Sequence, residues 1–231
     1  MLLRLDKYLS EAGYTRSNAK ELIKKGLVKV NGQVVKDSSL KIESNSTVSV
    51  QDKEIIYEQY VYYMLNKPGG YVSATEDDKA PTVVSLIKDN VKNIFPIGRL
   101  DKDTEGLLIL TNDGELSHNL LSPVKHVEKK YYVETDKSID GSLKDVFKNG
   151  ININNEYTTA PSELEIISDT SAFVTITEGK YHQVKRMFKS QGLNVIYLKR
   201  VSMKNLSLDE NLSPGEYRRL TDDEVNDLKK V

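Results

Sequence analysis

Apolar residues at the start of the chain recur at helical spacing and predict two short helices. Gly13 ends the first and Gly26 the second, because glycine is favoured just past the last turn of a helix. Thr15 or Ser17 can cap the second helix with its hydroxyl group. The apolar positions are Leu2, Leu5, Leu9 and Ala12 for the first helix, and Ala19, Leu22 and Ile23 for the second.

Alternating apolar residues then predict a small sheet. The alternation covers residues 27–30, 33–35 and 47–50. Asn31-Gly32 stands between the first two runs and favours a tight hairpin, because both turn positions need a positive φ. Residues 51–59 are mostly polar, so we expect a boundary there and a first domain over residues 1–56.

Strands and helices are mixed without regular alternation in the rest of the chain. Predicted strands cover Tyr60–Leu65, Gly106–Thr111, Tyr131–Thr135, Phe173–Thr177 and Asn194–Leu198. Predicted helices cover Thr82–Asp89, Glu115–Leu121, Ser142–Asn149, His182–Ser190 and Asp222–Lys230. This order favours an α+β fold over a doubly wound sheet, with a second domain over residues 60–231.

Positive charge is concentrated in the first domain. Residues 1–41 hold nine of the 33 Lys and Arg residues and four of the 34 Asp and Glu residues, a balance of +5; the remaining 24 and 30 leave −6. Arg16, Lys20 and Lys24 recur every four residues and share one helix face, with Lys25 and Lys29 nearby. Such a face can follow an RNA backbone, although a solvated lysine face is the simpler alternative.

Two runs in this domain resemble the S4 RNA-binding domain. They are Arg4-Leu5-Asp6-Lys7-Tyr8-Leu9 and residues 17–32, from Ser17-Asn18-Ala19-Lys20 to Val30-Asn31-Gly32. The resemblance covers about 50 residues and implies a helical hairpin with a small β-sheet that binds structured RNA and does no chemistry itself. The candidate RNA contacts are Arg4, Lys7, Arg16, Lys20, Lys24, Lys29 and Asn31.

Composition narrows the class further. Apolar residues make up 38% of the 231 and charged residues 29%, and no run approaches the 18 apolar residues of a membrane span. A cytoplasmic protein is expected, since the amino end lacks a secretion signal and there is no cysteine. No glycine-rich phosphate loop precedes a helix, so we expect neither nucleotide cofactor nor metal. The histidines, interpreted as structural or RNA-contacting, are His118, His126 and His182.

The most informative run is Gly98 to Gly114. Arg99 stands two positions before Asp101, and a polar turn and a short apolar strand follow. A loop fixed to a buried strand can hold a carboxylate in a cleft. The residues alone do not choose between Asp101, Asp103 and Glu105, and three solvated acids in an ordinary turn remain the alternative.

Two further runs carry candidate chemistry. In Glu178–Phe188, Lys185 and Arg186 point in different directions on a helix, so one can pair with a carboxylate while the other meets phosphate; a basic surface helix is the alternative. In Val127–Val133, Tyr131 and Tyr132 face opposite sides of a strand. Core packing is the simpler role for either tyrosine, and stacking on a base is the functional one.

Together these runs resemble the RsuA/RluB type of rRNA pseudouridine synthase. The matching segments are Asn66-Lys67-Pro68-Gly69-Gly70, residues 98–114, Lys129-Lys130-Tyr131 and residues 179–188. The resemblance implies a catalytic domain with a mixed, mainly antiparallel sheet flanked by helices. It implies isomerisation of uridine to pseudouridine without a cofactor, by a carboxylate that attacks C1′ or deprotonates C2′ of a flipped nucleotide.

The resemblance also assigns roles by position. Asp101 becomes the essential carboxylate, Lys185 its basic partner, and Tyr131 the ring that packs against the target base. Arg99 is expected to enter the RNA stack or hold the flipped nucleotide. Asp103 and Glu105 are left as solvent or turn residues. Further RNA contacts are expected at Lys180, His182 and Arg186.

The substrate is expected to be ribosomal RNA. Gly179-Lys180-Tyr181-His182-Gln183-Val184-Lys185-Arg186-Met187 resembles the small-subunit branch, so we expect action on 16S rRNA or a small-subunit assembly intermediate. A monomer is the simplest expectation for the oligomeric state. The alternatives are the same chemistry on a 23S rRNA hairpin, and a non-catalytic RNA-binding assembly factor.

Overall fold

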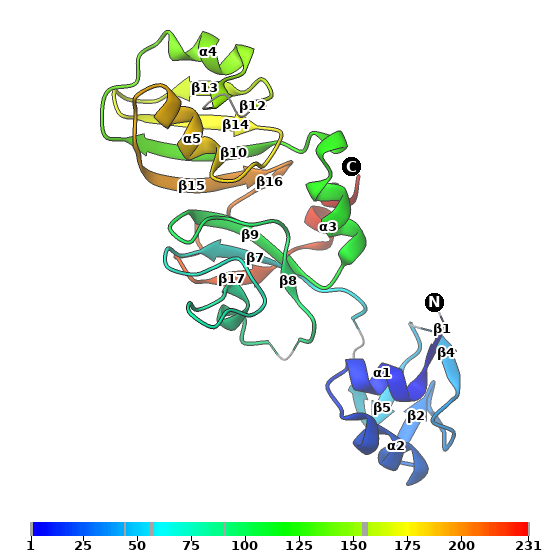
Figure 1. The fold of residues 1–231 in the computed structure, drawn as a ribbon. Helices are drawn as coiled ribbons and strands as arrows, with labels where there is room; N and C mark the ends of the chain where they lie inside the picture. The colour runs from blue at the N-terminus through cyan, green and yellow to red at the C-terminus, as the bar shows by residue number, and fades with distance from the viewer. Residues whose placement is uncertain (1, 44, 56–57, 90, 154–156, 231) are drawn as a thin grey trace. The chain divides into compact units, whose positions relative to one another are not determined.

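The chain folds into two compact units. The computed structural model describes residues 2–43, 45–55, 58–89, 91–153 and 157–230. One unit comprises Met1–Val61 with Asp89–Asn93, and the other comprises Tyr62–Lys88 with Ile94–Val231 (Figure 1). Among the described residues, the helices are too short and too polar to cross a membrane.

The smaller unit packs two helices against short strands. The helices are α1 (Leu5–Glu11) and α2 (Arg16–Lys24), and Thr15 caps α2 by accepting the backbone N–H of Asn18. Their apolar faces meet in a core with the sheet residues, so the helical spacing read from the sequence is largely confirmed. The strands are β1 (Leu2–Arg4) paired with β4 (Lys41–Glu43), and a sheet in the order β3 (Gln33–Val34), β2 (Val28–Val30), β5 (Val48–Val50), β6 (Lys53–Ile55).

The hairpin turn is confirmed, and two details of this unit differ from prediction. Asn31 and Gly32 have φ angles of 49° and 81°. Leu2 does not begin the first helix: it lies in β1, where Leu3 faces the core and Leu2 faces solvent, as strand alternation requires. The polar boundary stretch contains β6, which a turn at Gln51-Asp52 joins to β5; both turn residues have positive φ without being glycine.

The larger unit is built on one mixed sheet. Its strands run in the order β13-β14-β10-β15-β9-β7-β17, with β16 beside β15 and β8 beside β9. Only the β15–β9 pair is parallel among the described pairs, which confirms the mixed, mainly antiparallel α+β architecture. The strands are β7 (Tyr62–Lys67), β8 (Phe95–Pro96), β9 (Glu105–Thr111), β10 (Lys129–Thr135), β13 (Glu163–Ile166), β14 (Ser171–Ile176), β15 (Val195–Met203), β16 (Leu206–Ser207) and β17 (Tyr217–Arg219), with a separate hairpin of β11 (Asn152–Ile153) and β12 (Tyr157–Thr158).

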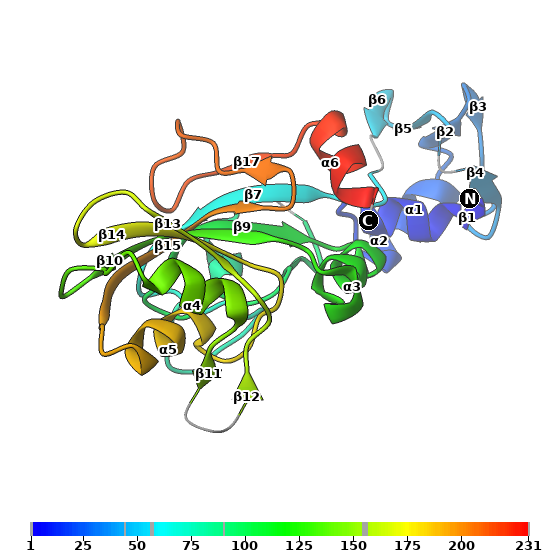
Figure 2. The same ribbon diagram turned by 90° about the horizontal axis from the view of Figure 1, so that it is seen from above.

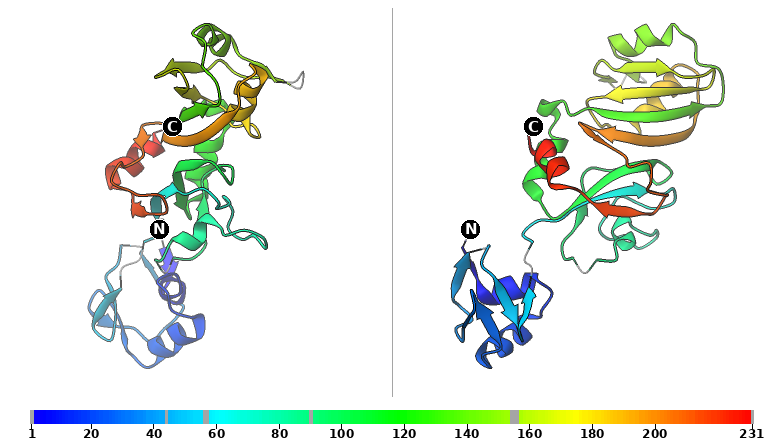
Figure 3. Two further views of the ribbon diagram at one scale, coloured as in Figure 1. Left: turned by 90° about the vertical axis from the view of Figure 1, so that its left-hand side faces the viewer. Right: turned by 180° about the vertical axis from the view of Figure 1, so that it is seen from behind.

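Helices cover this sheet in two groups. Helices α4 (Leu143–Asn149) and α5 (Gln183–Ser190) lie on one face of the β13–β15 half, where Phe147 and Phe188 meet with ring centroids 5.1 Å apart (Figure 2). Helices α3 (Gly114–Leu121) and α6 (Asp222–Lys229) pack together at one end of the β9–β7 half (Figure 3). The predicted helix over residues 82–89 is wrong: only a 3₁₀ turn forms, at Val83–Leu86, where β-branched residues disfavour a longer helix.

A close approach of two backbones joins the halves of the sheet. Strands β15 and β9 pair over only two registers, and Gly106 lies opposite Arg200. Gly106 has a φ of 98°, and a Cβ atom there would overlap the carbonyl oxygen of Arg200. Arg200 is buried and donates from Nε to the carbonyl oxygen of Leu107 at 2.8 Å. This contact brings the loop before β9 against β15 and α5.

Candidate active site

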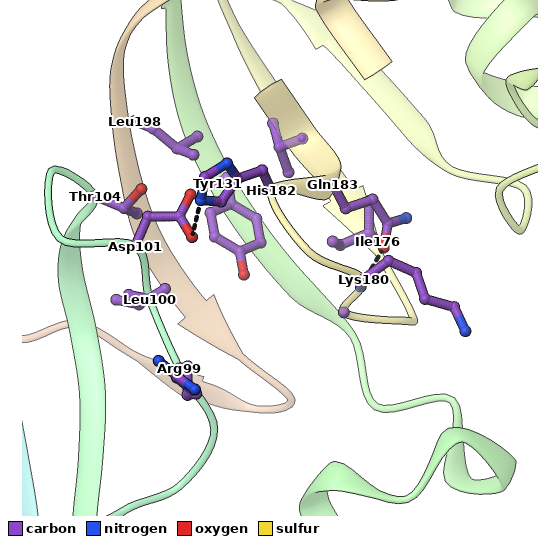
Figure 4. A pocket seen from close by; sticks show the side chains of 12 residues that line it. Arg99, Leu100, Asp101, Thr104, Tyr131, Ile176, Lys180, His182, Gln183 and Leu198 are labelled. Atoms are coloured by element: carbon purple, nitrogen blue, oxygen red, sulfur yellow. Dashed lines mark hydrogen bonds and ion pairs between the residues drawn. The ribbon is translucent and has the colours of Figure 1, made fainter. Parts of the chain in front are cut away.

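A pocket opens where that loop meets β10, β14, β15 and the start of α5. In Figure 4 the side chains of Asp101, Tyr131 and His182 point toward one another within it. Leu198 and Ile176 supply apolar wall. The lining residues are Arg99, Leu100, Asp101, Thr104, Tyr131, Ile176, Gly179, Lys180, His182, Gln183, Val184 and Leu198.

Hydrogen bonds hold the backbone on both sides of Asp101. Before it, the Ser73 hydroxyl accepts the N–H of Leu100 at 3.0 Å and donates to the Leu100 carbonyl at 2.9 Å. After it, the fully buried Lys67 donates from Nζ to the carbonyl oxygens of Thr104 at 2.7 Å and Lys102 at 3.2 Å. Because these anchors lie within three residues of Asp101 along the chain, the carboxylate starts from a fixed position.

Burial lowers the pKa of Lys67 to about 8. Nearby Asp103, Glu105 and Asp101 act in the opposite direction, by attraction to the ammonium group. The segment Asn66–Gly70, which matches the family in sequence, contains Lys67, but the resemblance gave Lys67 no role. The available signal was a lysine two positions after the apolar run Tyr62–Leu65.

Two basic side chains from α5 and its cap face Asp101. Lys185 Nζ lies 3.4 Å from Oδ2 of Asp101, and His182 Nε2 lies 3.5 Å from Oδ1. The Asp101 side chain is 26% exposed, so it reaches both the pocket and these partners. The structure therefore brings the expected pair, Asp101 and Lys185, together and adds His182, which the sequence analysis interpreted as structural or RNA-contacting.

The other two acids of the loop are more engaged than expected. Asp103 lies 2.5 Å from Lys185, and this bond lowers the pKa of the Asp103 carboxyl. Glu105 accepts the hydroxyl of Tyr197 at 2.9 Å and the N–H of Gly69 at 3.4 Å. Asp103 is an exposed turn residue as expected, although it also pairs with Lys185. For Glu105 the expectation is wrong, because it begins β9, is only partly exposed and accepts hydrogen bonds from Tyr197 and Gly69.

The turn that leads into α5 is fixed by one glutamine. Gln183 accepts the Lys180 N–H through Oε1 at 2.9 Å and donates from Nε2 to Glu178 at 2.7 Å. His182 has a φ of 48°, a left-handed conformation that non-glycine residues rarely adopt. This conformation aims the imidazole at Asp101.

The two tyrosines of β10 take different environments. Tyr131 is 8% exposed and its ring lines the pocket (Figure 4). Tyr132 faces the other side, packs edge-on against Phe173 and Tyr197, and donates its hydroxyl to Glu134 at 2.9 Å. Their opposite orientation is as predicted from the strand.

Arg99 and Lys180 line the pocket, and Arg186 is not among the residues that line it. Arg99 and Lys180 are exposed lining residues. Arg186 points instead toward Tyr157, with its guanidinium carbon 5.6 Å from the ring centroid. The remaining histidines lie elsewhere, His118 on α3 and His126 at the end of a 3₁₀ turn.

In the smaller unit, three candidate RNA contacts are exposed along α2 and others are paired. The exposed residues are Arg16, Lys20 and Lys24. Arg4 binds Asp6 at 2.8 Å, Lys7 lies 3.5 Å from Glu11 and Lys29 lies 2.5 Å from Asp52. Asn31 uses its side-chain oxygen to accept the N–H of Thr47 at 3.1 Å, which ties the hairpin to β5.

Residues 61–190 match the RNA pseudouridylate synthase family, and residues 3–48 match the S4 domain. The chain belongs to the RNA pseudouridylate synthase family. Both parts of the resemblance seen in the sequence are therefore confirmed, and the protein is an isomerase with an RNA-binding domain.

Relatives match over the full length of this synthase. It is 44% identical to the uncharacterized RNA pseudouridine synthase YtzG of Bacillus subtilis, over 99% of each chain. It is 42% identical to ribosomal small subunit pseudouridine synthase A of Vibrio cholerae (99% of this chain, 100% of the relative) and 38% identical to that of Escherichia coli (96% and 98%). A crystal structure of a pseudouridylate synthase aligns with a TM-score of 0.70 and 39% identity, over 98% of this chain and 99% of that one.

The arrangement suits a synthase that works through one carboxylate. Acidic and histidine side chains in the described part of the chain form no cluster of three that could hold a metal ion. Asp101 has the ammonium group of Lys185 at 3.4 Å and the imidazole of His182 at 3.5 Å. The pocket wall around it combines apolar and aromatic side chains, Tyr131, Ile176 and Leu198, with polar ones.

Proposed function

We propose that this protein converts a uridine of 16S rRNA to pseudouridine during maturation of the small ribosomal subunit. The observation that carries the proposal is the Asp101 carboxylate at the pocket, with Lys185 and His182 within 3.5 Å. The relatives named ribosomal small subunit pseudouridine synthase A support the choice of 16S rRNA.

In the proposed reaction Asp101 acts on the ribose of a flipped uridine. Its carboxylate either attacks C1′ or removes the proton at C2′, and the C–N bond to uracil breaks. The detached uracil turns within the pocket and C5 bonds to C1′; on the first route the Asp101–C1′ bond breaks in this step, and on the second the proton returns to C2′. The proton on C5 then leaves and N1 gains a proton. No redox change occurs, and the walls of the pocket keep water from trapping the ribose.

Three further residues have proposed roles in that reaction. Lys185 balances the charge of Asp101 and holds its carboxylate in place. Tyr131 packs its ring against the uracil and limits its movement, which its position in the pocket wall supports. Arg99, exposed beside the pocket, takes the place of the flipped base in the RNA stack or holds the displaced nucleotide.

RNA outside the pocket is bound by two basic surfaces. Residues 1–56 are proposed as the RNA-binding domain and residues 60–231 as the catalytic domain. Arg16, Lys20 and Lys24 bind phosphates along the exposed face of α2, aided by Arg4, Lys7, Lys29 and Asn31. Lys180, His182 and Arg186 contact RNA near the pocket. We further propose a cytoplasmic monomer, acting on rRNA or on an assembly intermediate.

The test is a map of pseudouridines in both large rRNAs of a deletion strain. The strain is complemented with the wild-type gene or with Asp101→Asn. Loss of one 16S pseudouridine, restored only by the wild type, supports the proposal. Loss of a 23S site alone overturns the small-subunit substrate, and no loss in either rRNA favours a non-catalytic assembly factor.

A further inference from the structure

The aromatic ring of Tyr181 is exposed beside the pocket. Tyr181 is 76% exposed, the second most exposed of the large hydrophobic residues described. One face of its ring stacks on the imidazole of His182, with centroids 3.9 Å apart and planes 18° apart. His182 in turn contacts Asp101. Tyr181 is therefore the outer ring of a stack whose inner ring touches the proposed reacting carboxylate.

The fold maintains this stack at a cost. His182 adopts the left-handed conformation, which costs a non-glycine residue about 1 kcal/mol or more. Gln183, which follows the two ring residues in the chain, holds the turn through hydrogen bonds to Lys180 and Glu178, which precede them. If Tyr181 were buried, its packing in the core would account for the strained backbone, but the residue is largely exposed and contributes little to the core. The exposed face is left for a ligand.

The chemistry of the surroundings favours a nucleobase on that face. Two parallel rings 3.9 Å apart repeat the geometry of stacked bases, and aromatic rings accept any base because each has a π face. Lys180 precedes Tyr181, and Lys180 and Arg99 are exposed pocket residues that attract phosphate. When a uridine is flipped, its neighbours lose a stacking partner.

We propose that Tyr181 is a stacking site for an unpaired base of the substrate RNA next to the flipped uridine. The proposal rests on the proposed function, because it places this base beside a uridine that occupies the Asp101 pocket. Tyr131 and Tyr181 then have separate tasks: Tyr131 contacts the target uracil inside the pocket, and Tyr181 contacts its neighbour outside. The site selects RNA whose target uridine lies in an unpaired or opened segment.

The chain lacks tryptophan, which allows a direct test of stacking. Tyr181→Trp introduces a single tryptophan at the proposed site, and a stacked base quenches its fluorescence. Ile167→Trp is the matched control, since Ile167 is 50% exposed and lies beyond the end of β13, near the start of β14. The probe is a 16S rRNA fragment that the wild-type protein converts, with and without abasic nucleotides flanking the target.

The expected result is quenching in the Tyr181→Trp protein only. The quenching should disappear when the flanking nucleotide is abasic. The abasic RNA is added at a concentration high enough for binding, and filter binding confirms that it is bound. Unquenched fluorescence with bound RNA, or quenching that persists with abasic neighbours on both sides, overturns the stacking site. If the wild type converts no rRNA fragment, the proposed function itself fails; conversion without quenching defeats the stacking site alone.

Kinetics separate stacking from a structural role. Tyr181→Leu should raise KM about 5- to 100-fold, the range of one lost base–aromatic stack, while Tyr181→Phe stays near the wild type. In both variants the single-turnover rate at saturating RNA should change by less than about threefold, because the Tyr181 ring does not reach the reacting atoms. A fall confined to this rate, with KM unchanged, overturns the proposal in favour of a role in positioning His182.

Discussion

The ammonium group of Lys185 lies 2.5 Å from a carboxylate oxygen of Asp103. Its distance to Asp101 is longer, 3.4 Å, although Asp101 is the residue expected to need a cation. The Asp103 side chain is 77% exposed and that of Asp101 26% exposed. The tighter contact is therefore made by the more solvated acid, and Lys185 is shared between the two.

Asp103→Asn is expected to leave most of the activity in place. An exposed ion pair contributes at most about 1 kcal/mol, so the single-turnover rate should change by no more than about fivefold. Asp101→Asn, assayed in parallel with the same rRNA fragment, should make no pseudouridine while still binding RNA. Equal loss in both variants would show that Asp103 takes part in the chemistry.

Lys185→Met should lower the single-turnover rate about 10- to 100-fold. The reason is the loss of a charge-assisted contact with Asp101, worth roughly 1.5–3 kcal/mol. Lys185→Arg keeps the positive charge and should retain most of the rate. Thermal unfolding of both variants controls for misfolding, and a Lys185→Met protein as active as the wild type would remove Lys185 from its proposed role.

The sequence indicated which two segments of the chain contribute to the candidate active site, but not which of their side chains contact each other. Residues 98–114 and 179–188 pointed to Asp101 and Lys185 through motif resemblance, and the pattern of residues predicted most of the seven-residue strands β9 and β10. Short strands such as β16 and β17, of two and three residues, have too few positions to show a period.

Which side chains of the candidate site pair with each other depends on the register of the sheet, which the sequence does not show. Asp103 meets Lys185 because Gly106 and Arg200 bring β9 beside β15 in parallel. Lys67 donates a hydrogen bond to Thr104, 37 residues further along the chain, and no local sequence pattern predicts a contact between residues so far apart. The role of His182 depends on a backbone conformation, φ 48°, that its residue type does not favour.

Gly106→Ala should strongly destabilise the larger unit. The added methyl group would overlap the carbonyl oxygen of Arg200, and the φ of 98° is unfavourable for alanine. Overpacking and backbone strain together should lower the free energy of unfolding by roughly 3 kcal/mol or more. Urea unfolding measures this, with Gly114→Ala as the control: nothing lies within 4 Å of a Cβ there, and alanine favours the first turn of α3. A Gly106→Ala protein as stable as that control would contradict the close approach.

Replacing the three cations of α2 should weaken RNA binding in a salt-dependent way. The variant Arg16→Gln/Lys20→Gln/Lys24→Gln removes the exposed face while leaving Ala19 and Ile23 in the core. If each residue binds one phosphate, the slope of log K against log salt should fall by about two to three. Filter binding at several salt concentrations measures it. The control is Lys53→Gln, a single exposed cation on β6; an unchanged slope in the triple variant would show that α2 does not bind RNA.

Stability should rise between pH 8 and pH 10 because of two buried lysines. Burial lowers the pKa of both Lys67 and Lys129 to about 8, below the ordinary 10.5. Between these values the unfolded chain binds more protons than the folded one, so the free energy of unfolding increases with pH, by up to about 1.4 kcal/mol per pH unit for each lysine. Above pH 10 the effect is opposed by Tyr197, whose pKa burial raises to about 12, since the folded state then keeps a proton that the unfolded state loses.

Lys129→Met tests this pH dependence. Lys129 is 8% exposed, and within the described ranges its ammonium has one hydrogen-bond acceptor, the Val127 carbonyl at 2.7 Å, so its burial at neutral pH is poorly compensated. Methionine fills a similar volume without charge, so the variant should be at least as stable as the wild type at pH 7 and show a smaller rise toward pH 10. Lys130→Met, on the same strand but ion-paired with Glu165 at the surface, should keep the full slope. Urea midpoints at pH 7, 8, 9 and 10 decide the matter, and a stability that falls from pH 8 to pH 10 in the wild type would contradict the lowered pKa of these lysines.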